Sequence, residues 1–154
     1  MPSLHAIYAS TSGHTEYVVS VLLSYLRKDG LKDSEIQRVE QAGIEDLSRG
    51  DILLLASGTW NTGGIEGQLN PHMHDFLGKR AAKVDLHGRK LALIGLGDAR
   101  YRYTCRAAAH LEAFVESHGG KLVLPTLRIV NEPYGQEAKI QKWGQKLLRN
   151  FSTP

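Results

Sequence analysis

The chain has 154 residues, of which 42% are hydrophobic and 23% are charged, which fits one folded domain and excludes a disordered chain. Its net charge is +3, with Lys and Arg spread along the sequence, so charge gives nucleic-acid binding little support. The single cysteine, Cys105, excludes an internal disulfide, and the sequence shows no leader pattern and no apolar run of about 18 residues. We therefore expect a cytoplasmic protein that contacts no membrane.

The first third of the chain predicts a strand, a tight loop and a helix. Residues 4–9 form an apolar run, and apolar residues then recur at helical spacing over residues 15–28. Gly30 is expected to end this helix in a left-handed conformation. Residues 34–39 predict a weak, peripheral strand, and residues 46–47 a short helix or turn.

The middle of the chain predicts two buried strands separated by a helix. The continuous apolar run at residues 52–56 is typical of a strand covered on both faces, and it leads into a polar loop at residues 57–64. A helix is expected next, with Pro71 near its start, and residues 90–96 form another buried strand. The residues expected to face inward on this helix are Leu69, Phe76 and Leu77.

The last third predicts a further loop, two helices and one strand. The loop covers residues 97–103, and the helix after it ends at residues 119–120. Residues 121–130 predict the last strand, which Pro125 should either break or confine to an edge. The final helix is expected over residues 136–151.

Strand and helix therefore alternate along the whole chain, without a repeat or a linker. This order predicts the α/β class, with an open, mostly parallel sheet covered by helices on both faces, as a single domain over residues 1–154. Ligands of such sheets bind at the carboxyl ends of the strands. Three of the polar loops follow strands and are expected at that edge.

The first of these loops has the composition of a phosphate site. Four hydroxyl residues surround Gly13 at the start of a helix, where backbone N–H groups and the helix dipole favour an anion. The loop lacks the lysine and the spacing of a nucleoside-triphosphate loop. An ordinary capped turn between a strand and a helix is the alternative. The four hydroxyl residues are Ser10, Thr11, Ser12 and Thr15.

The other two loops carry aromatic residues, Trp60 in the second loop and Tyr101 and Tyr103 in the third. A ligand with a phosphate at one end and a flat aromatic body at the other would suit all three loops. The alternative is that these rings are partly buried side chains at the rim of the sheet.

Three motifs stand in a specific order and spacing: Ser10-x-Ser12-Gly13-x-Thr15, the run from Asp51 to Trp60, and the run from Gly95 to Cys105. With them the chain resembles the short-chain flavodoxins over essentially its full length. The segment at residues 127–133 also looks like the short-chain ending, without the insertion of the long-chain kind.

The resemblance implies a flavodoxin-like three-layer α/β/α sandwich, with a five-stranded parallel sheet in the order 2-1-3-4-5. It implies a monomeric, low-potential carrier that binds one FMN noncovalently and shuttles single electrons between redox enzymes. A flavodoxin is not itself an enzyme, so no catalytic residue is expected.

The same resemblance assigns the cofactor contacts. The first loop would hold the phosphate, with help from two hydroxyls of the second loop. Trp60 and Tyr101 would flank the flavin ring, and the remaining residues would meet its polar edge. The full set is Ser10, Thr11, Ser12, Gly13, His14, Thr15, Ser57, Gly58, Thr59, Trp60, Asn61, Thr62, Gly63, Leu96, Gly97, Asp98, Tyr101, Tyr103 and Cys105.

The chain departs from the family in its basic charge. Arg100, Arg102 and Arg106 stand near the predicted ring against Asp98, which predicts a less negative potential for the second electron and partners with acidic docking faces. The final helix adds further cations against Glu137, and solvated surface charge is the alternative reading of both groups. These cations are Lys139, Lys142, Lys146 and Arg149.

His14 is the second departure, because the family commonly has asparagine at this place in the phosphate loop. A histidine beside a phosphate favours its charged form, so FMN binding is expected to tighten as the pH falls from about 8 to 6. The alternative is an imidazole that faces solvent.

Other function classes remain open from the sequence. A small FMN-dependent quinone or disulfide reductase would need a substrate pocket, and no inserted segment builds one. An activator subunit of a metallo-oxidoreductase is also compatible, whereas the phosphorylatable aspartate of a signalling receiver domain is missing. No metal site is expected, because His72 and His74 would face apart on a helix. Cys105 is expected to be a packed thiol near the flavin and not a nucleophile, since no activating base is evident.

Overall fold

The centre of the molecule is a parallel sheet in a computed structural model that describes residues 2–100 and 104–151. β1 (Ser3–Ala9) lies between β2 (Asp33–Arg38) and β3 (Ile52–Thr62), and β5 (Lys90–Gly97) lies beyond β3. These four strands pair in parallel throughout. β2 is therefore an edge strand, as its weak apolar pattern predicted.

The fifth position in the sheet is filled by two short strands instead of one. β6 (Lys121–Leu122) and β7 (Leu127–Val130) both pair in parallel with β5. The predicted break at Pro125 is confirmed, and the Pro125 carbonyl accepts a hydrogen bond of 2.8 Å from Trp143 Nε1 instead of a bond within the sheet. Counted along the parallel strands, the order is the predicted 2-1-3-4-5.

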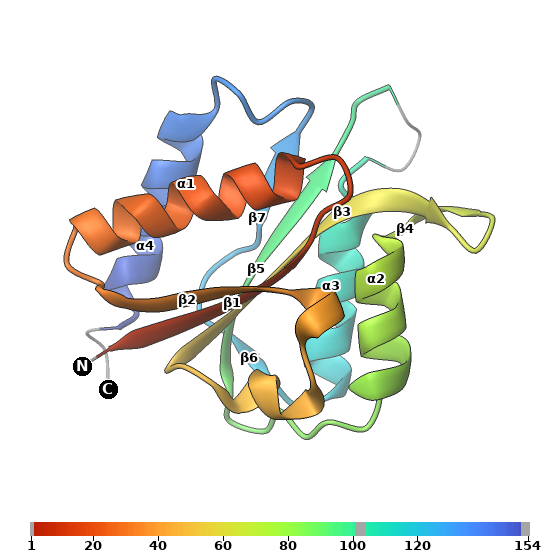
Figure 1. Cartoon of the computed structure of the whole chain (residues 1–154), viewed down its shortest axis with the longest axis horizontal. Helices are drawn as coiled ribbons and strands as arrows, with labels where there is room; N and C mark the ends of the chain where they lie inside the picture. The colour runs from red at the N-terminus through yellow and green to blue at the C-terminus, as the bar shows by residue number, and fades with distance from the viewer. Residues whose placement is uncertain (1, 101–103, 152–154) are drawn as a thin grey trace.

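Helices cover both faces of the sheet. Figure 1 shows α1 (His14–Lys28) and α4 (Glu137–Arg149) on one side, and α2 (Pro71–Asp75) and α3 (Arg106–Ser117) on the other. The predicted three-layer α/β/α sandwich is confirmed. The shorter helical segments are the 3₁₀ turns Val39–Gln41 and Ile44–Ser48 and the π-helical turn Phe76–Arg80.

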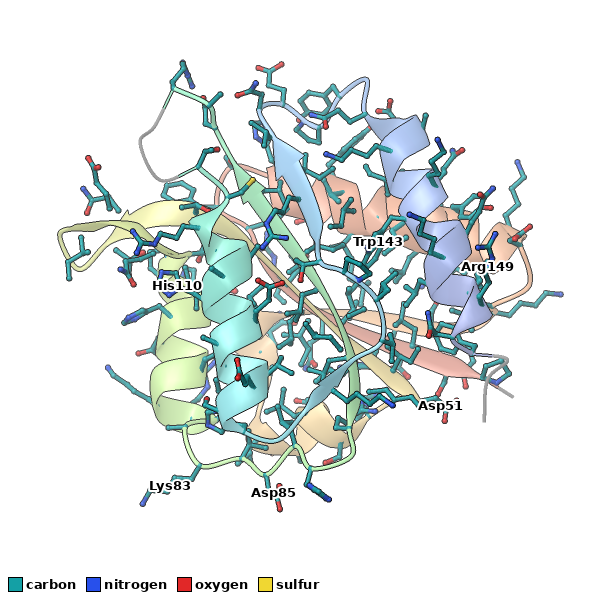
Figure 2. All side chains as sticks on the ribbon, turned by 180° about the vertical axis from the view of Figure 1, so that it is seen from behind. Asp51, Lys83, Asp85, His110, Trp143 and Arg149 are labelled. Atoms are coloured by element: carbon teal, nitrogen blue, oxygen red, sulfur yellow. The ribbon has the colours of Figure 1, made fainter. Side chains whose placement is uncertain are left out.

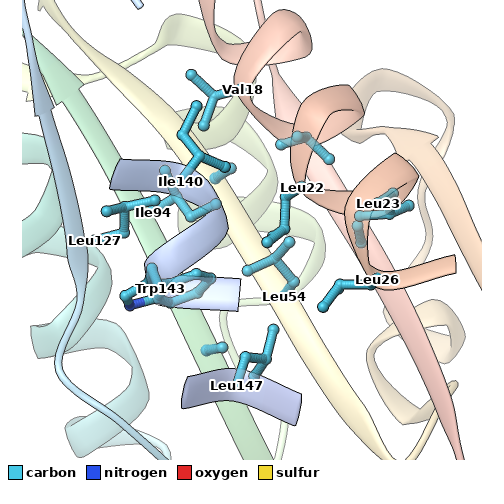
Figure 3. Close-up of a cluster of buried hydrophobic side chains, with 14 of the residues drawn as sticks. Val18, Leu22, Leu23, Leu26, Leu54, Ile94, Leu127, Ile140, Trp143 and Leu147 are labelled. Atoms are coloured by element: carbon cyan, nitrogen blue, oxygen red, sulfur yellow. The ribbon is translucent and has the colours of Figure 1, made fainter. Parts of the chain in front are cut away.

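The core beneath α1 and α4 follows directly from their sequence patterns. Leu22 and Leu26 repeat at a spacing of four on α1, and Trp143 and Leu147 do so on α4, so each helix turns one apolar stripe to the sheet. Figure 3 shows these stripes meeting Leu54 and other side chains of the central strands. Burial of these side chains fixes both helices over the sheet.

The opposite face has a second core, where α3 packs very closely against the end of β5. A Cβ atom at Gly95 would lie 2.7 Å from the Cβ and the backbone nitrogen of Ala108. Only a glycine opposite a small residue allows this approach. The close packing brings the start of α3 directly under the carboxyl end of the sheet.

The stretch after Trp60 differs from the sequence prediction. Residues 57–64 were expected to be a loop, but β3 runs on through them to Thr62 and the chain returns as the antiparallel strand β4 (Ile65–Leu69). Gly63 and Gly64 both have positive φ, the conformation that a tight two-residue hairpin turn requires. The placement of Leu69 in the following helix was also wrong, since Leu69 ends β4. The sheet therefore contains one antiparallel strand beside its parallel ones.

The helices of the described residues are short compared with the thickness of a membrane. Across residues 2–100 and 104–151, no helix has both the length and the apolar character that a bilayer span requires.

Candidate functional site

A hollow of about 480 Å³ opens at the carboxyl ends of β1, β3 and β5. Side chains from all three predicted loops line it, together with the β3–β4 hairpin and the segment after β7. A larger hollow of about 730 Å³ lies at the other end of α1 and α4, near Pro2, Leu31 and Phe151. The larger one is more open and is lined by none of the three predicted loops, so we take the smaller, at the strand ends, as the functional site.

The first loop turns sharply from β1 into α1. Gly13 precedes the helix with φ of 93°, a conformation that favours glycine. Ser10 Oγ accepts hydrogen bonds from the backbone N–H groups of Gly13 (3.1 Å) and Glu16 (3.3 Å). These two bonds fix the conformation of the loop at the start of α1. The positive end of the α1 dipole points at the hollow, which suits an anion.

His14 is the first residue of α1, and its side chain packs against the segment between β7 and α4. Its ring meets that of Tyr134 edge to face, with 5.6 Å between centroids, and Tyr134 also contacts Tyr17. The Tyr17 hydroxyl donates a 2.5 Å hydrogen bond to Glu137, which lowers the pKa of that carboxyl. The β7–α4 segment is thus held against the start of α1.

The second loop forms one wall of the hollow. Trp60 is 36% exposed on β3, and a Cβ atom at Gly58 would lie 3.0 Å from its indole Nε1. His110 of α3 fixes the hairpin beyond Trp60, because its Nε2 donates a hydrogen bond of 2.7 Å to Gly67 O. Figure 2 shows His110 on α3 beside this hairpin.

Two hydroxyls of the second loop have structural partners. Thr59 Oγ1 donates to Leu96 O (2.8 Å) and accepts from Ala107 N (3.0 Å), so it joins β3, β5 and the start of α3. Ser57 is fully buried, where its Oγ donates to Gly58 O and accepts from Asn70 N. Direct contact of these hydroxyls with a phosphate therefore stays a prediction.

The third loop leaves β5 at Gly97, under a tight steric constraint. A Cβ atom there would lie 2.1 Å from the Cys105 backbone nitrogen, so only glycine fits. Asn131, after β7, donates from its backbone N–H to Gly97 O (2.7 Å) and accepts from Ala99 N (2.9 Å) through its side chain. This asparagine ties the third loop to the last strand.

Cys105 precedes α3 with φ of 57° and is buried. Its Sγ lies 3.3 Å from Ile129 O, in the protein interior, and burial raises the pKa of the thiol. The side chain is a packed thiol, as the sequence indicated, and it does not line the hollow. A cofactor contact by Cys105 stays a prediction.

The rim carries charges of both signs. Arg100 pairs with Asp98 at 2.6 Å, and this bond lowers the pKa of the Asp98 carboxyl. Glu66 and Glu132 also line the hollow, so the described lining has three carboxylates and one guanidinium. The sequence-based count, with three arginines against one aspartate, missed both glutamates because they lie in the hairpin and after β7.

Most of the predicted site residues meet in this one hollow. Those on its lining are Thr11, Ser12, His14, Thr15, Gly58, Thr59, Trp60, Asn61, Leu96, Gly97 and Asp98. Those behind the lining or away from it are Ser10, Gly13, Ser57, Thr62, Gly63 and Cys105. Tyr101 and Tyr103 lie outside the described residues, as does Arg102.

Sequence reasoning missed several residues of the site. Asn131 and Asn70 gave only local signals, a left-handed turn and a helix cap before proline, and neither signal reveals contacts with distant loops. The lining residues that were not predicted for the site are Glu66, Gly67, Thr104, Asn131 and Glu132. Elsewhere, among the described side chains, no three His, Cys, Asp or Glu residues come together as a metal site requires.

Comparisons with known proteins agree with this geometry. Residues 7–143 match the family model of flavodoxin. The flavodoxin of Maridesulfovibrio salexigens is 31% identical over 141 residues, covering 90% of this chain and 91% of that protein. The probable flavodoxin 2 of Bacillus subtilis is 29% identical over 142 residues, covering 89% and 87%.

A solved structure extends the comparison to the fold. The crystal structure of oxidised flavodoxin 2 from Bacillus cereus superposes with a TM-score of 0.86 at 28% identity, covering 97% of this chain and 99% of that one. The family match spans the first loop, the central strands and the first half of α4. The chain belongs to the flavodoxin family, whose members bind FMN and carry electrons between redox proteins without being enzymes.

Proposed function

We propose that the hollow at the strand ends holds one FMN, with the phosphate at the first loop and the ring beside Trp60 and the third loop. The observation that carries this proposal is the meeting of a helix N-terminus, an indole wall and a glycine-lined loop in one hollow. A volume of about 480 Å³ lies within the roughly 300–1,000 Å³ typical of small-molecule sites.

The phosphate end of the hollow fits a dianion without a cationic side chain in the loop. Thr11, Ser12 and Thr15 line it with hydroxyl groups, and the first N–H groups of α1 have no partner within the helix. Neutral donors and the helix dipole would therefore bind the phosphate. His14 is the one imidazole of this loop.

The ring end fits a flat aromatic group. Trp60 supplies an aromatic wall, and Gly58 leaves the space beside the indole that any side chain would fill. When bound, FMN supplies the one-electron chemistry, while the protein sets its surroundings. The Trp60 side chain and the Asn61–Gly67 hairpin would exclude water from one side of the ring.

A flavin titration tests this assignment. The chain contains only two tryptophans, Trp60 in the hollow and Trp143 on the buried side of α4. We expect FMN to bind the apoprotein at one equivalent and to quench the emission of Trp60. Trp60→Phe should remove most of this quenching, whereas unchanged quenching in that variant would place the flavin elsewhere.

We propose that redox partners approach at the ring end and meet a surface of mixed charge. Glu66 and Glu132 line the hollow, whereas Lys139 and Lys142 are exposed on α4, the helix that follows the Glu132 segment. Basic groups of a partner would face the rim, and acidic groups would face α4. The acidic docking faces expected from the sequence would then belong to the α4 side of the contact.

The charge at the rim can be measured without a known partner. Reoxidation of the reduced, FMN-loaded protein is compared between anionic ferricyanide and a cationic hexaamminecobalt(III) complex over a range of ionic strength. For a rim dominated by carboxylates, the rate with the cationic oxidant falls as salt is added and the rate with ferricyanide rises. The opposite signs would show that the arginines dominate.

We further propose that the chain works as a single-domain monomer in the cytoplasm. The described strands form one sheet, and the exposed large apolar residues are spread over β2, the 3₁₀ turn Ile44–Ser48, the β3–β4 hairpin and the segment before α4. They are Ile36, Ile44, Trp60, Ile65 and Tyr134. Sedimentation equilibrium should return the 17.0 kDa mass of the chain. A mass of twice that value at micromolar protein would refute a monomer.

A further inference from the structure

Asn70 joins the phosphate loop to the second loop and to α2, although it belongs to none of the family motifs. It is fully buried between β4 and α2. Its backbone N–H donates to Ser57 Oγ (3.0 Å) and to Gly58 O (3.1 Å). Its side chain reaches Thr11 in the first loop, 59 positions away in the sequence.

The orientation of the Asn70 amide follows from its neighbours. The atom that faces the backbone N–H of His72, at 3.0 Å, must be the oxygen, because a backbone N–H can only donate. The NH₂ group therefore faces Thr11 Oγ1, at 2.9 Å. The oxygen caps the first turn of α2, and the nitrogen is left to donate to the phosphate loop.

This bond determines what the Thr11 hydroxyl can do. A hydroxyl has one hydrogen to donate and an oxygen that can accept. Since Thr11 Oγ1 accepts from Asn70, its hydrogen remains for another acceptor. Thr11 is exposed and lies on the lining of the hollow, at the phosphate end.

We propose that Asn70 is a positioning residue, which fixes the Thr11 hydroxyl as a donor toward the FMN phosphate. The inference rests on the proposed binding site. A carboxylate in place of the amide would accept the Thr11 hydrogen and take this donor away from the phosphate. It would also add a negative charge behind the anion site. The amide thus leaves the Thr11 hydrogen available to the phosphate.

Asn70→Asp is the sharpest test, because it keeps the size of the side chain and the cap on α2. We expect its FMN dissociation constant at pH 7.5 to rise roughly 10- to 100-fold, the range for losing one hydrogen bond to a charged acceptor. Asn70→Ser also keeps the cap but cannot reach Thr11, and it should raise the constant only a few-fold. Asn150→Asp, a remote surface change of equal charge, is the control for net charge and should leave it unchanged.

Two further readouts separate positioning from a merely structural role. In a Thr11→Val background, Asn70→Asp should raise the FMN dissociation constant by a factor at least about threefold smaller than in the parent, because the hydroxyl that it redirects is gone. The FMN dissociation constant of Asn70→Asp, divided by that of the parent protein, should also become smaller between pH 7.5 and 5. At the lower pH the introduced carboxyl gains a proton that it can donate to Thr11. Urea unfolding of each apoprotein checks that the fold is kept.

The inference is overturned if Asn70→Asp binds FMN as tightly as the parent, or if its effect is the same with and without the Thr11 hydroxyl. Either result would leave the proposed binding site intact, because the parent protein would still bind FMN. Failure of the parent protein itself to bind FMN would overturn the site and the inference together.

Discussion

Thr59→Val removes the one hydroxyl that joins the second loop, β5 and α3. The side chains have nearly the same shape, but the variant leaves Leu96 O without its donor and Ala107 N without its acceptor. The cap residue of α3, Cys105, supplies no side-chain hydrogen bond, so Thr59 caps this helix from 48 positions away. The loss therefore affects both the helix start and the contact between two strands.

The magnitude follows from the two groups that lose their partners. Each buried, unsatisfied group costs about 1–3 kcal/mol. Water can reach the partly buried Thr59, so we expect a total of about 2–3 kcal/mol. For a domain of this size the midpoint of thermal unfolding should fall by roughly 5–10 °C. Urea and thermal unfolding of the apoprotein measure both quantities.

Thr62→Val is the matched control on the same strand. Thr62 Oγ1 makes one hydrogen bond, to Leu69 O within the hairpin, so this change should cost only about 1 kcal/mol. The reasoning is refuted if both variants are destabilised equally, or if Thr59→Val loses less than about 0.5 kcal/mol.

Three further predictions concern titratable groups. In the parent protein, FMN binding is expected to tighten roughly two- to fivefold from pH 8 to 6, and His14→Asn should remove most of this change. Fluorescence titrations measure the dissociation constants, and an equal pH dependence in the variant and the parent would refute a role for His14. The hydrogen bond from the Gly43 N–H lowers the pKa of Asp46, so Asp46 stabilises the fold when ionised and this stability is lost as the pH falls through that lowered pKa. Asp46→Asn should therefore be less stable than the parent at pH 7, with a difference that closes below about pH 4 in urea titrations; a constant difference would contradict this. Burial and the raised pKa of the Cys105 thiol predict that iodoacetamide labels the native protein on the order of 100-fold more slowly than the urea-unfolded protein, and equal rates would show an accessible thiol.

The sequence patterns predicted the layers of the fold because the buried face of a helix or strand requires apolar residues at regular spacing. Leu22 and Leu26 on α1 and the unbroken apolar runs of β3 and β5 are local features, so periodicity alone identifies them. The parallel order of the strands placed three loops at one edge, and the structure brings them together in one hollow. The predicted break at Pro125 was equally local, because proline cannot donate within a sheet.

The hairpin after Trp60 was missed although its signal is present. Gly63 and Gly64 are adjacent glycines of the kind that tight hairpin turns use, but the polar residues around them are also typical of a loop. What distinguishes the two is pairing of Thr59 with Leu69 and support from His110 of α3, which are tertiary contacts. The contact between Asn70 and Thr11 is hidden for the same reason.

The direction of the Cys105 side chain could not be read from the motif that contains it. Its positive φ and the close approach of Gly97 turn the thiol toward Ile129 and into the interior. Spacing along the chain predicts which loop a residue belongs to. It does not predict whether the side chain or only the backbone of that residue faces the ligand.

Stepwise reduction of the FMN-loaded protein, followed by absorption at controlled potential, tests the central claim most directly. A carrier of single electrons should take up two electrons in two separate one-electron steps. The protein should contain one FMN per chain and show no turnover of NAD(P)H with quinone by itself. Uptake of both electrons in a single step, or a protein that cannot be loaded with FMN, would contradict the account.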